Sequence, residues 1–251
     1  MESNFESQQF RDELAKKIIE TPKNEREEIL AQAKQTPEYW QARSDKIHER
    51  ENEEEIDGGL GVLVKRKTLY HGSGTSGIKR FDEAEDDTVG SGIYFTSEAN
   101  AAIGYAIRRS KRERDPHEAY KFDANSVPTI YESSVESMRL LDLRKDDNVK
   151  KILGGFKQFI REKLKDPELP YIVSMGIGFI IEKIDSGKIG AGNLKDVAQS
   201  QGPMFTDYCK SLGYEGLITF EGGEGEDVGN HDTYVIFDPE RAKIVQEQNI
   251  K

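Results

Sequence analysis

The apolar positions of this chain change their spacing near residue 60. In residues 1–56 they recur at helical spacing, and threonine-proline pairs open two of the helices. The acidic run Glu49–Glu55 continues the last of these helices, and the glycines in 58–61 then break the period. We therefore predict an N-terminal helical segment over residues 1–57 and a second domain over residues 58–251.

Beyond this boundary, strand-like and helix-like patterns follow one another in blocks. Runs rich in β-branched and aromatic residues predict strands, and an alanine-rich stretch and a long amphipathic stretch predict helices. The predicted strands are 62–64, 68–70, 92–96, 129–143, 216–220 and 234–238, and the predicted helical regions are 97–110 and 146–212. Because the two kinds of element are segregated instead of alternating, we predict the α+β class.

The composition of the chain limits the classes of molecule that it is expected to bind. The chain has 251 residues, enough for one good-sized core, and its 36 basic against 47 acidic side chains give a net charge of −11. We expect no general nucleic-acid-binding surface, because phosphate backbones are held by an excess of lysine and arginine. The basic run Arg108–Arg114 is either a local anion-binding patch or a solvated helix end.

The single cysteine and the N-terminus exclude further classes. Cys209 alone forms no internal disulfide and no cysteine-based zinc site, and its apolar setting predicts a buried spectator. We predict no metal site. The N-terminus carries no Sec signal peptide, and the apolar stretch 171–181 is too short to span a bilayer. We therefore expect a cytoplasmic protein, or one delivered without a Sec signal, and no membrane association.

Two short segments combine strand-like runs with chemistry. Leu69–Ser73 places His71 before a glycine, and Gly90–Thr96 places Tyr94 after Gly-Ser-Gly-Ile. Such runs beside turn residues are typical of strand ends that open onto a cleft. An imidazole there can bond ribose hydroxyls, and Tyr94 with Tyr105 can stack on a cationic ring. The alternatives are an ordinary loop histidine and a tyrosine packed in the core.

These segments, with Tyr105-Ala106, Leu212–Leu217 and the closing Tyr234–Pro239, resemble the His-Tyr clade of ADP-ribosyltransferases. This clade includes diphtheria toxin and the poly(ADP-ribose) polymerases. The pattern is most similar to the compact bacterial and phage group found in polyvalent proteins. The resemblance covers about residues 62–246, and only these short blocks carry it. It implies a split β-sheet core with a helical insertion, NAD as substrate, and a toxin-like effector.

The resemblance also implies a role for each matched residue. His71 would contact the adenosine ribose, and the Gly72 backbone would hold the nicotinamide carboxamide. Ser73 would lie along the adenosine side. Tyr94 and Tyr105 would sandwich the nicotinamide ring, where a cationic ring gains stacking and cation–π attraction.

Two positions depart from the family pattern. Ala102 stands where family members often have a serine that donates to the carboxamide. Thr233 stands where polymer-forming members have a glutamate that binds the nicotinamide ribose and supports positive charge in an oxocarbenium-like transition state. The candidates to replace that carboxylate are Asp232 and, on the preceding loop that usually reads the acceptor, Glu224, Glu226 and Asp227.

The expected reaction is therefore one transfer of ADP-ribose from NAD to a macromolecular acceptor, with protein favoured, and release of nicotinamide. Chain elongation is disfavoured because Thr233 offers no charge. The alternatives are a catalytically inactive NAD- or partner-binding module of the same fold, and an RNA 2′-phosphotransferase. The acidic composition and the lack of a phosphate-binding set of arginines around His71 disfavour the second alternative.

Overall fold

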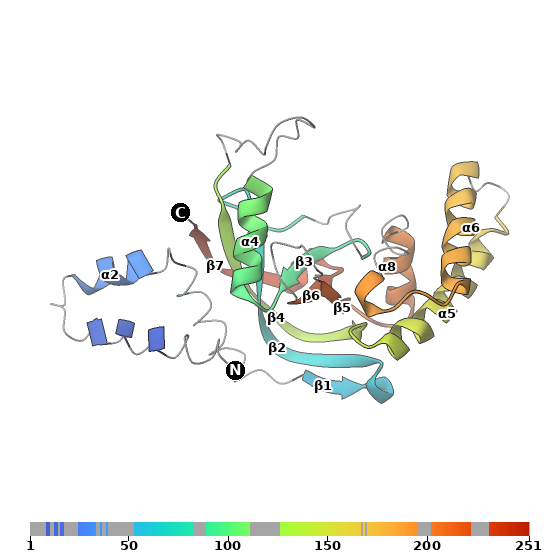
Figure 1. Cartoon of the computed structure of the whole chain (residues 1–251), viewed down its shortest axis with the longest axis horizontal. Coiled ribbons are helices and arrows are strands. Elements are labelled where there is room, and N and C mark those ends of the chain that lie inside the picture. Colours follow the sequence, from blue (N-terminus) through green and yellow to red (C-terminus); the bar gives the residue numbers. More distant parts are fainter. Residues whose placement is uncertain are drawn as a thin grey trace.

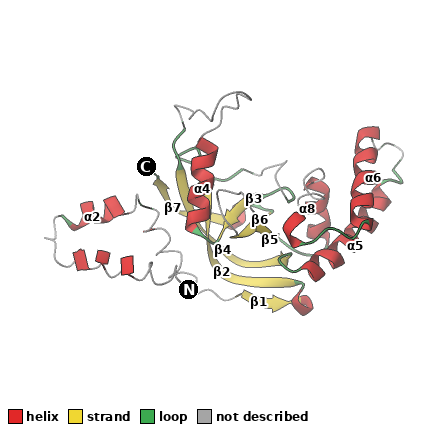
Figure 2. Ribbon diagram, in the orientation of Figure 1, coloured by secondary structure: helices red, strands yellow, loops and turns green. Residues whose placement is uncertain are grey.

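The structure is a computed structural model that describes residues 53–82, 89–110, 126–166, 168, 170–194, 202–221 and 231–250, together with 25–33 and a few other positions between 9 and 39. Its elements are shown in Figures 1 and 2. The strands are β1 (Glu53–Ile56), β2 (Gly61–Ser73), β3 (Ile93–Thr96), β4 (Thr129–Asp142), β5 (Gly216–Glu221), β6 (His231–Ile236) and β7 (Ala242–Asn249). The α-helices are α2 (Arg26–Ala33), α4 (Ala99–Ser110), α5 (Asp146–Lys163), α6 (Tyr171–Asp185) and α8 (Gly202–Ser211), and the short 3-10 helices are η1 (Asp57–Gly59), η2 (Ala191–Asn193) and η4 (Pro239–Arg241).

The long strands β2 and β4 form the antiparallel centre of the sheet. On the edge that faces away from β4, strand β2 bonds β1 near the start of β2 and bonds β3 at Tyr70. The outer edge of β4 bonds β7 along its first half and β5, in parallel, at its end. Strand β6 joins β3 to β5, so β2, β3, β6, β5 and β4 close into a barrel-like ring. The predicted α+β class is confirmed.

Alternate residues of this sheet point to two faces. The inner face carries an apolar cluster to which β2, β3, β4, β5 and β6 all contribute, with Leu69, Phe95 and Tyr131 among its members. The other face, here called the helix-covered face, packs against helices at two places. Helix α4 covers it beside β2, and α5, α6 and α8 gather at the opposite end (Figure 1).

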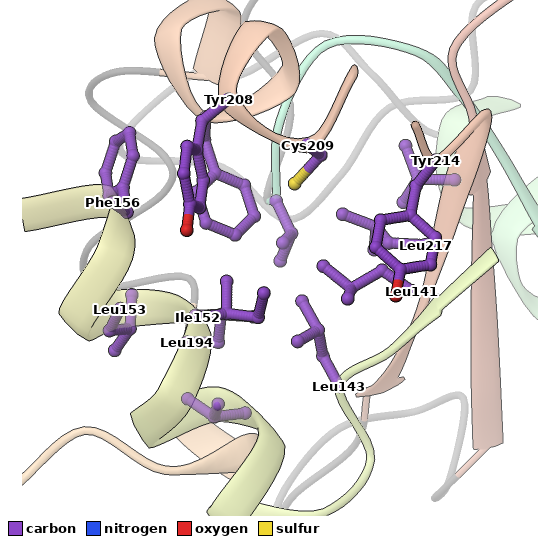
Figure 3. Close-up of a cluster of buried hydrophobic side chains, with 14 of the residues drawn as sticks. Leu141, Leu143, Ile152, Leu153, Phe156, Leu194, Tyr208, Cys209, Tyr214 and Leu217 are labelled. Atoms are coloured by element: carbon purple, nitrogen blue, oxygen red, sulfur yellow. The ribbon is translucent and has the colours of Figure 1, made fainter. Parts of the chain in front are cut away.

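The cluster beneath α5 and α8 is the larger apolar core of the helix-covered face. Figure 3 shows side chains of both helices meeting those of β4 and β5, with the Cys209 sulfur inside the cluster. Cys209 is fully buried, and burial raises the pKa of its thiol. The predicted spectator role agrees with this burial. Gly213, two residues after the end of α8, has a φ of +85° and donates from its backbone nitrogen to the carbonyl oxygen of Lys210, as glycines do at helix ends.

The contact between α4 and β2 explains why this helix is rich in alanine. A Cβ atom on Gly72 would overlap the carbonyl oxygen of Ala102 and lie 2.7 Å from the backbone nitrogen of Ala106. Ala99, Ala102 and Ala106 have no exposed surface. A glycine on the strand and alanines on the helix therefore let the two backbones approach closely, and the helix predicted within 97–110 is confirmed.

Strand β1 corrects one sequence prediction. The assignment of Glu49–Glu55 to a helix is wrong for Glu53–Glu55, which pair with β2. The physical reason is the environment of Glu53, which meets the Lys67 ammonium at 3.1 Å, the Arg144 guanidinium at 3.1 Å and the Tyr234 hydroxyl at 2.8 Å. These partners hold an acidic side chain against the sheet, so β1 lies before the predicted boundary at residue 57 and still joins this sheet.

Two further observations concern the segments outside the sheet. Tyr39, from the N-terminal segment, packs against the apolar cluster of α4. Among the helices that the structure describes, none is both long and apolar enough to cross a membrane.

Candidate functional site

The two motifs that carry the family resemblance meet through a hydrogen bond at the edge between β2 and β3. His71 Nδ1 lies 2.8 Å from the carbonyl oxygen of Tyr94. A carbonyl oxygen only accepts, so Nδ1 carries the proton in this contact. The imidazole is half-buried and packs edge-on against Phe81 at 5.1 Å and Phe95 at 5.8 Å between ring centroids. The contact therefore fixes both the orientation and the tautomer of His71.

Tyr94 leaves β3 on the helix-covered face, directly opposite Val235 of β6. Its hydroxyl donates to the carbonyl oxygen of Gly90 at 2.7 Å and accepts from the backbone nitrogen of Val89 at 2.6 Å. Gly90 has a φ of +84°, a conformation that favours glycine. The phenol thus holds the turn that leads into β3.

The other residues predicted around the dinucleotide lie at the end of β2 and on α4. Gly72 and Ser73 are half-buried, and Ser73 Oγ accepts from the backbone nitrogen of Thr75 at 3.1 Å. Ala102 is fully buried with its carbonyl oxygen against Gly72. Gly72 and Ala102 therefore approach each other closely, and His71 and Ser73 flank Gly72 along β2.

Tyr105 brings together two residues that sequence reasoning missed. Its hydroxyl donates to Glu221 Oε2 at 2.7 Å and lies 3.5 Å from His231 Nε2. The Tyr105 and His231 rings meet edge-on, with centroids 5.6 Å apart. Glu221 and His231 are cross-strand partners on β5 and β6. The strand predicted from the sequence ends at Phe220 and so leaves Glu221 outside it, although continuing the alternation of Leu217 and Thr219 by two residues puts Glu221 on the same face.

Thr233 lies in a row of buried threonines across three strands. It stands opposite Thr96 of β3 on one side and Thr219 of β5 on the other. All three are buried, and Thr233 Oγ1 has no hydrogen-bond partner in the described part of the chain. The register continues from Thr96 to Tyr70, which packs against α4. The polar row therefore lies on the helix-covered face, between the α4 cluster and the α8 cluster.

Asp232 points to the inner face, away from Thr233. Its Oδ2 accepts from Arg144 Nη1 at 2.7 Å, and Arg144 also bonds Asp142 and Glu53. Burial alone would lower the pKa of the Arg144 guanidinium, but Asp142 and Asp232 outweigh it and raise that pKa. The Asp232 carboxylate is thus already neutralised by a fixed cation. Glu224, Glu226 and Asp227 lie outside the described residues.

The helix-covered face thus gathers two phenol rings, buried hydroxyls and one carboxylate at β3, β5 and β6, while the His71 imidazole lies against Phe81 and Phe95 of the inner-face cluster. No group of three or more His, Cys, Asp or Glu side chains could hold a metal ion, as far as the described residues go. The chemistry that these groups suit is the binding of hydroxyl-rich and flat aromatic parts of a ligand, with one negative charge nearby.

Comparisons with known proteins add one structural likeness. No protein-family model matches the chain, and no curated protein matches it significantly. Among solved structures, the fold is similar to a chain in the crystal structure of the M. tuberculosis MbcT-MbcA toxin-antitoxin complex. The TM-score is 0.42 and the sequence identity 11%, over 83% of this chain and 91% of that chain.

Proposed function

We propose that this protein is an NAD-dependent mono-ADP-ribosyltransferase that transfers ADP-ribose to a macromolecular acceptor and releases nicotinamide. The observation that carries the proposal is the 2.8 Å contact between His71 Nδ1 and the carbonyl oxygen of Tyr94. This contact joins the two motifs on which the resemblance rests. It also orients the imidazole that, by the resemblance, would contact the adenosine ribose.

In this proposal the dinucleotide lies along the edge between β2 and β3. His71 bonds the adenosine ribose, the Gly72 backbone bonds the carboxamide, and Ser73 lies on the adenosine side. Tyr94 and Tyr105 contact the nicotinamide ring. Ala102 supplies no hydroxyl to the carboxamide, so the Gly72 backbone carries that recognition, at a loss of about 0.5–1.5 kcal/mol for one hydrogen bond.

The reaction is a substitution at C1′ of the nicotinamide ribose. The bond between C1′ and the nicotinamide nitrogen breaks, and its electron pair stays with the ring, which leaves neutral. A lone pair of the acceptor forms the new bond to C1′, and the acceptor's proton passes to solvent. Water in place of the acceptor gives free ADP-ribose. Because the leaving group is neutral, the site has only to orient NAD and to stabilise positive charge on the sugar.

The composition of the polar row favours one transfer over polymer synthesis. Thr233 and its neighbours Thr96 and Thr219 can bond ribose hydroxyls, but none of them carries the charge that would activate a second ribose as acceptor. The same row supports the second candidate, an inactive NAD-binding module of this fold. That module would bind NAD and leave it intact.

Nicotinamide release from NAD by the purified chain separates these candidates. We expect release by the wild type, and its loss in His71→Ala and in Tyr94→Ala. Tyr171→Ala is the matched control, because Tyr171 lies on α6 with 79% of its surface exposed, and we expect it to keep full activity. NAD binding without release in the wild type would favour the inactive module. Release that survives in both site variants would contradict the proposed site.

A further inference from the structure

One carboxylate on the helix-covered face is only half satisfied. Glu221 Oε2 accepts from the Tyr105 hydroxyl at 2.7 Å, while Oε1 is buried without a hydrogen-bond partner among the described residues. A buried polar atom without a partner is rare in folded proteins, and for a charged group it is costly. A ligand that brings positive charge or hydroxyl donors to Oε1 would remove that cost.

The strand register places this carboxylate beside Thr233. Glu221 pairs with His231, and Thr219 pairs with Thr233, two positions further along the same antiparallel strands. Residues two apart on a strand share a face, and diagonal neighbours are about 7–8 Å apart. The longer glutamate side chain therefore serves the same part of the face as the hydroxyl of Thr233.

The surroundings of Glu221 and Asp232 differ in whether a lysine or arginine pairs with the carboxylate. Asp232 is held by the Arg144 guanidinium on the inner face. Glu221 forms no ion pair with a lysine or arginine that the structure describes, and its bonded partner, Tyr105, is a neutral phenol. Among the described residues no fixed cation therefore compensates its negative charge, so the charge is available to a positive charge that forms during a reaction.

Resting on the proposed function, we infer that Glu221 is the catalytic carboxylate of this site. As the bond from C1′ to the nicotinamide nitrogen breaks and the ring takes the electron pair, Glu221 stabilises the positive charge that develops on the ribose. The charge disappears when the acceptor's lone pair bonds C1′ and its proton passes to solvent. Tyr105 is a positioning residue, because its hydroxyl fixes one carboxylate oxygen and directs the other.

The test is the steady-state release of nicotinamide, with NAD affinity measured separately by calorimetry. Glu221→Gln keeps the shape and the acceptor oxygen for Tyr105 and removes only the charge. Removing one preorganised electrostatic contact commonly lowers kcat by about 100- to 1,000-fold, and we expect a loss in that range with NAD affinity within about threefold of the wild type. Glu136→Gln, on the exposed side of β4, is the matched control and keeps wild-type kcat.

Two further variants keep the inference testable if the glutamine variant folds poorly, which its thermal unfolding would reveal. Glu221→Asp keeps the charge but withdraws it by one methylene, and Tyr105→Phe keeps the ring but removes the donor to Oε2. Each lowers kcat by at least tenfold, and the aspartate variant stays more active than any folded glutamine variant. For Tyr105→Phe, the loss falls on kcat and spares NAD affinity, which a general loosening of the fold would not do.

The outcomes separate this inference from the proposed function. A folded Glu221→Gln protein that binds NAD and loses more than tenfold in kcat supports the assignment. A loss smaller than tenfold, or a loss of NAD affinity that accounts for the whole effect, overturns it and leaves the transferase proposal standing. A wild-type protein that releases no nicotinamide overturns the proposed function, and the assignment with it.

Discussion

The strongest stability prediction concerns Arg144, whose guanidinium joins three strands. It donates to both oxygens of Asp142, to Asp232 Oδ2 and to Glu53 Oε2 over distances of 2.7–3.1 Å. The side chain of Asp142 is 3% exposed and that of Arg144 is 27% exposed. Arg144→Ala would leave the Asp142 carboxylate buried without its cation. It would also remove the hydrogen bonds from this guanidinium to Glu53 of β1 and Asp232 of β6.

The magnitude follows from the burial of these groups. Removing one partner of a buried ion pair costs about 3–5 kcal/mol, and the partial exposure of Arg144 puts this site at the lower end, about 3 kcal/mol. Arg80→Ala is the matched control, since Arg80 and Glu240 form an ion pair 2.9 Å long with both side chains about two-thirds exposed. Exposed pairs of this kind contribute less than about 1 kcal/mol.

The contribution of Arg144 to the free energy of unfolding depends on pH, because its carboxylate partners become protonated in acid. Burial alone would raise the pKa of the Asp142 carboxyl, but Arg144 outweighs it and holds that pKa below its usual value. Burial also opposes ionisation of Glu53, and Lys67, Tyr234 and Arg144 lower its pKa overall. A carboxylate whose pKa is lowered on folding stabilises the protein above its unfolded-state pKa, and that contribution is lost as the pH falls through the folded-state value.

Urea unfolding of the wild type, Arg144→Ala and Arg80→Ala at several pH values measures these differences in the free energy of unfolding. We expect a difference of about 3 kcal/mol between the wild type and Arg144→Ala at pH 7, which narrows below about pH 4 as the carboxyls become protonated. A difference below 1 kcal/mol at pH 7, or one that does not change with acidification, would refute the reasoning.

Three further predictions follow from packing. Gly72→Val pushes α4 away from β2, because even a Cβ atom overlaps the Ala102 carbonyl oxygen. We expect a loss of about 1–3 kcal/mol in the free energy of urea unfolding, and an unchanged midpoint would contradict this. Tyr94→Phe removes the hydroxyl that accepts from the Val89 backbone nitrogen at 2.6 Å. We expect a loss of about 1–3 kcal/mol in the same assay, and equal stability would show that this hydrogen bond contributes nothing. The Cys209 thiol is fully buried with a raised pKa, so a thiol reagent should label it only as fast as the protein unfolds, and rapid labelling of the folded chain would show that α8 opens.

The fold could be predicted from sequence wherever local signals agreed with packing. The alternating run 129–143 is the strand β4, and the alanine-rich run 97–110 is α4, because its small side chains suit the close contact with Gly72. The acidic residues of β1 could not be predicted. Their strand depends on Lys67 of the neighbouring strand and on Arg144, 91 residues away along the chain, and both meet Glu53 only after the sheet forms.

The candidate site divides in the same way. His71 and Tyr94 belong to local motifs, so the sequence pointed to both, and the structure adds the hydrogen bond between them. Glu221 and His231 carry no motif, because they flank a long polar segment and are related only by the register of β5 and β6. Tyr105 meets them from α4, more than 100 residues away along the chain, so sequence spacing offered no signal for their contact.

The measurement that tests the central claim most directly uses NAD labelled both in the nicotinamide ring and in the adenine. After incubation with the wild type and an acceptor-rich protein mixture, the account predicts that the ring label is free nicotinamide. The adenine label is then bound to protein, or is free ADP-ribose where water replaced the acceptor. Both changes disappear in His71→Ala. Recovery of both labels in intact NAD, from a wild-type protein shown to be folded, would contradict the account.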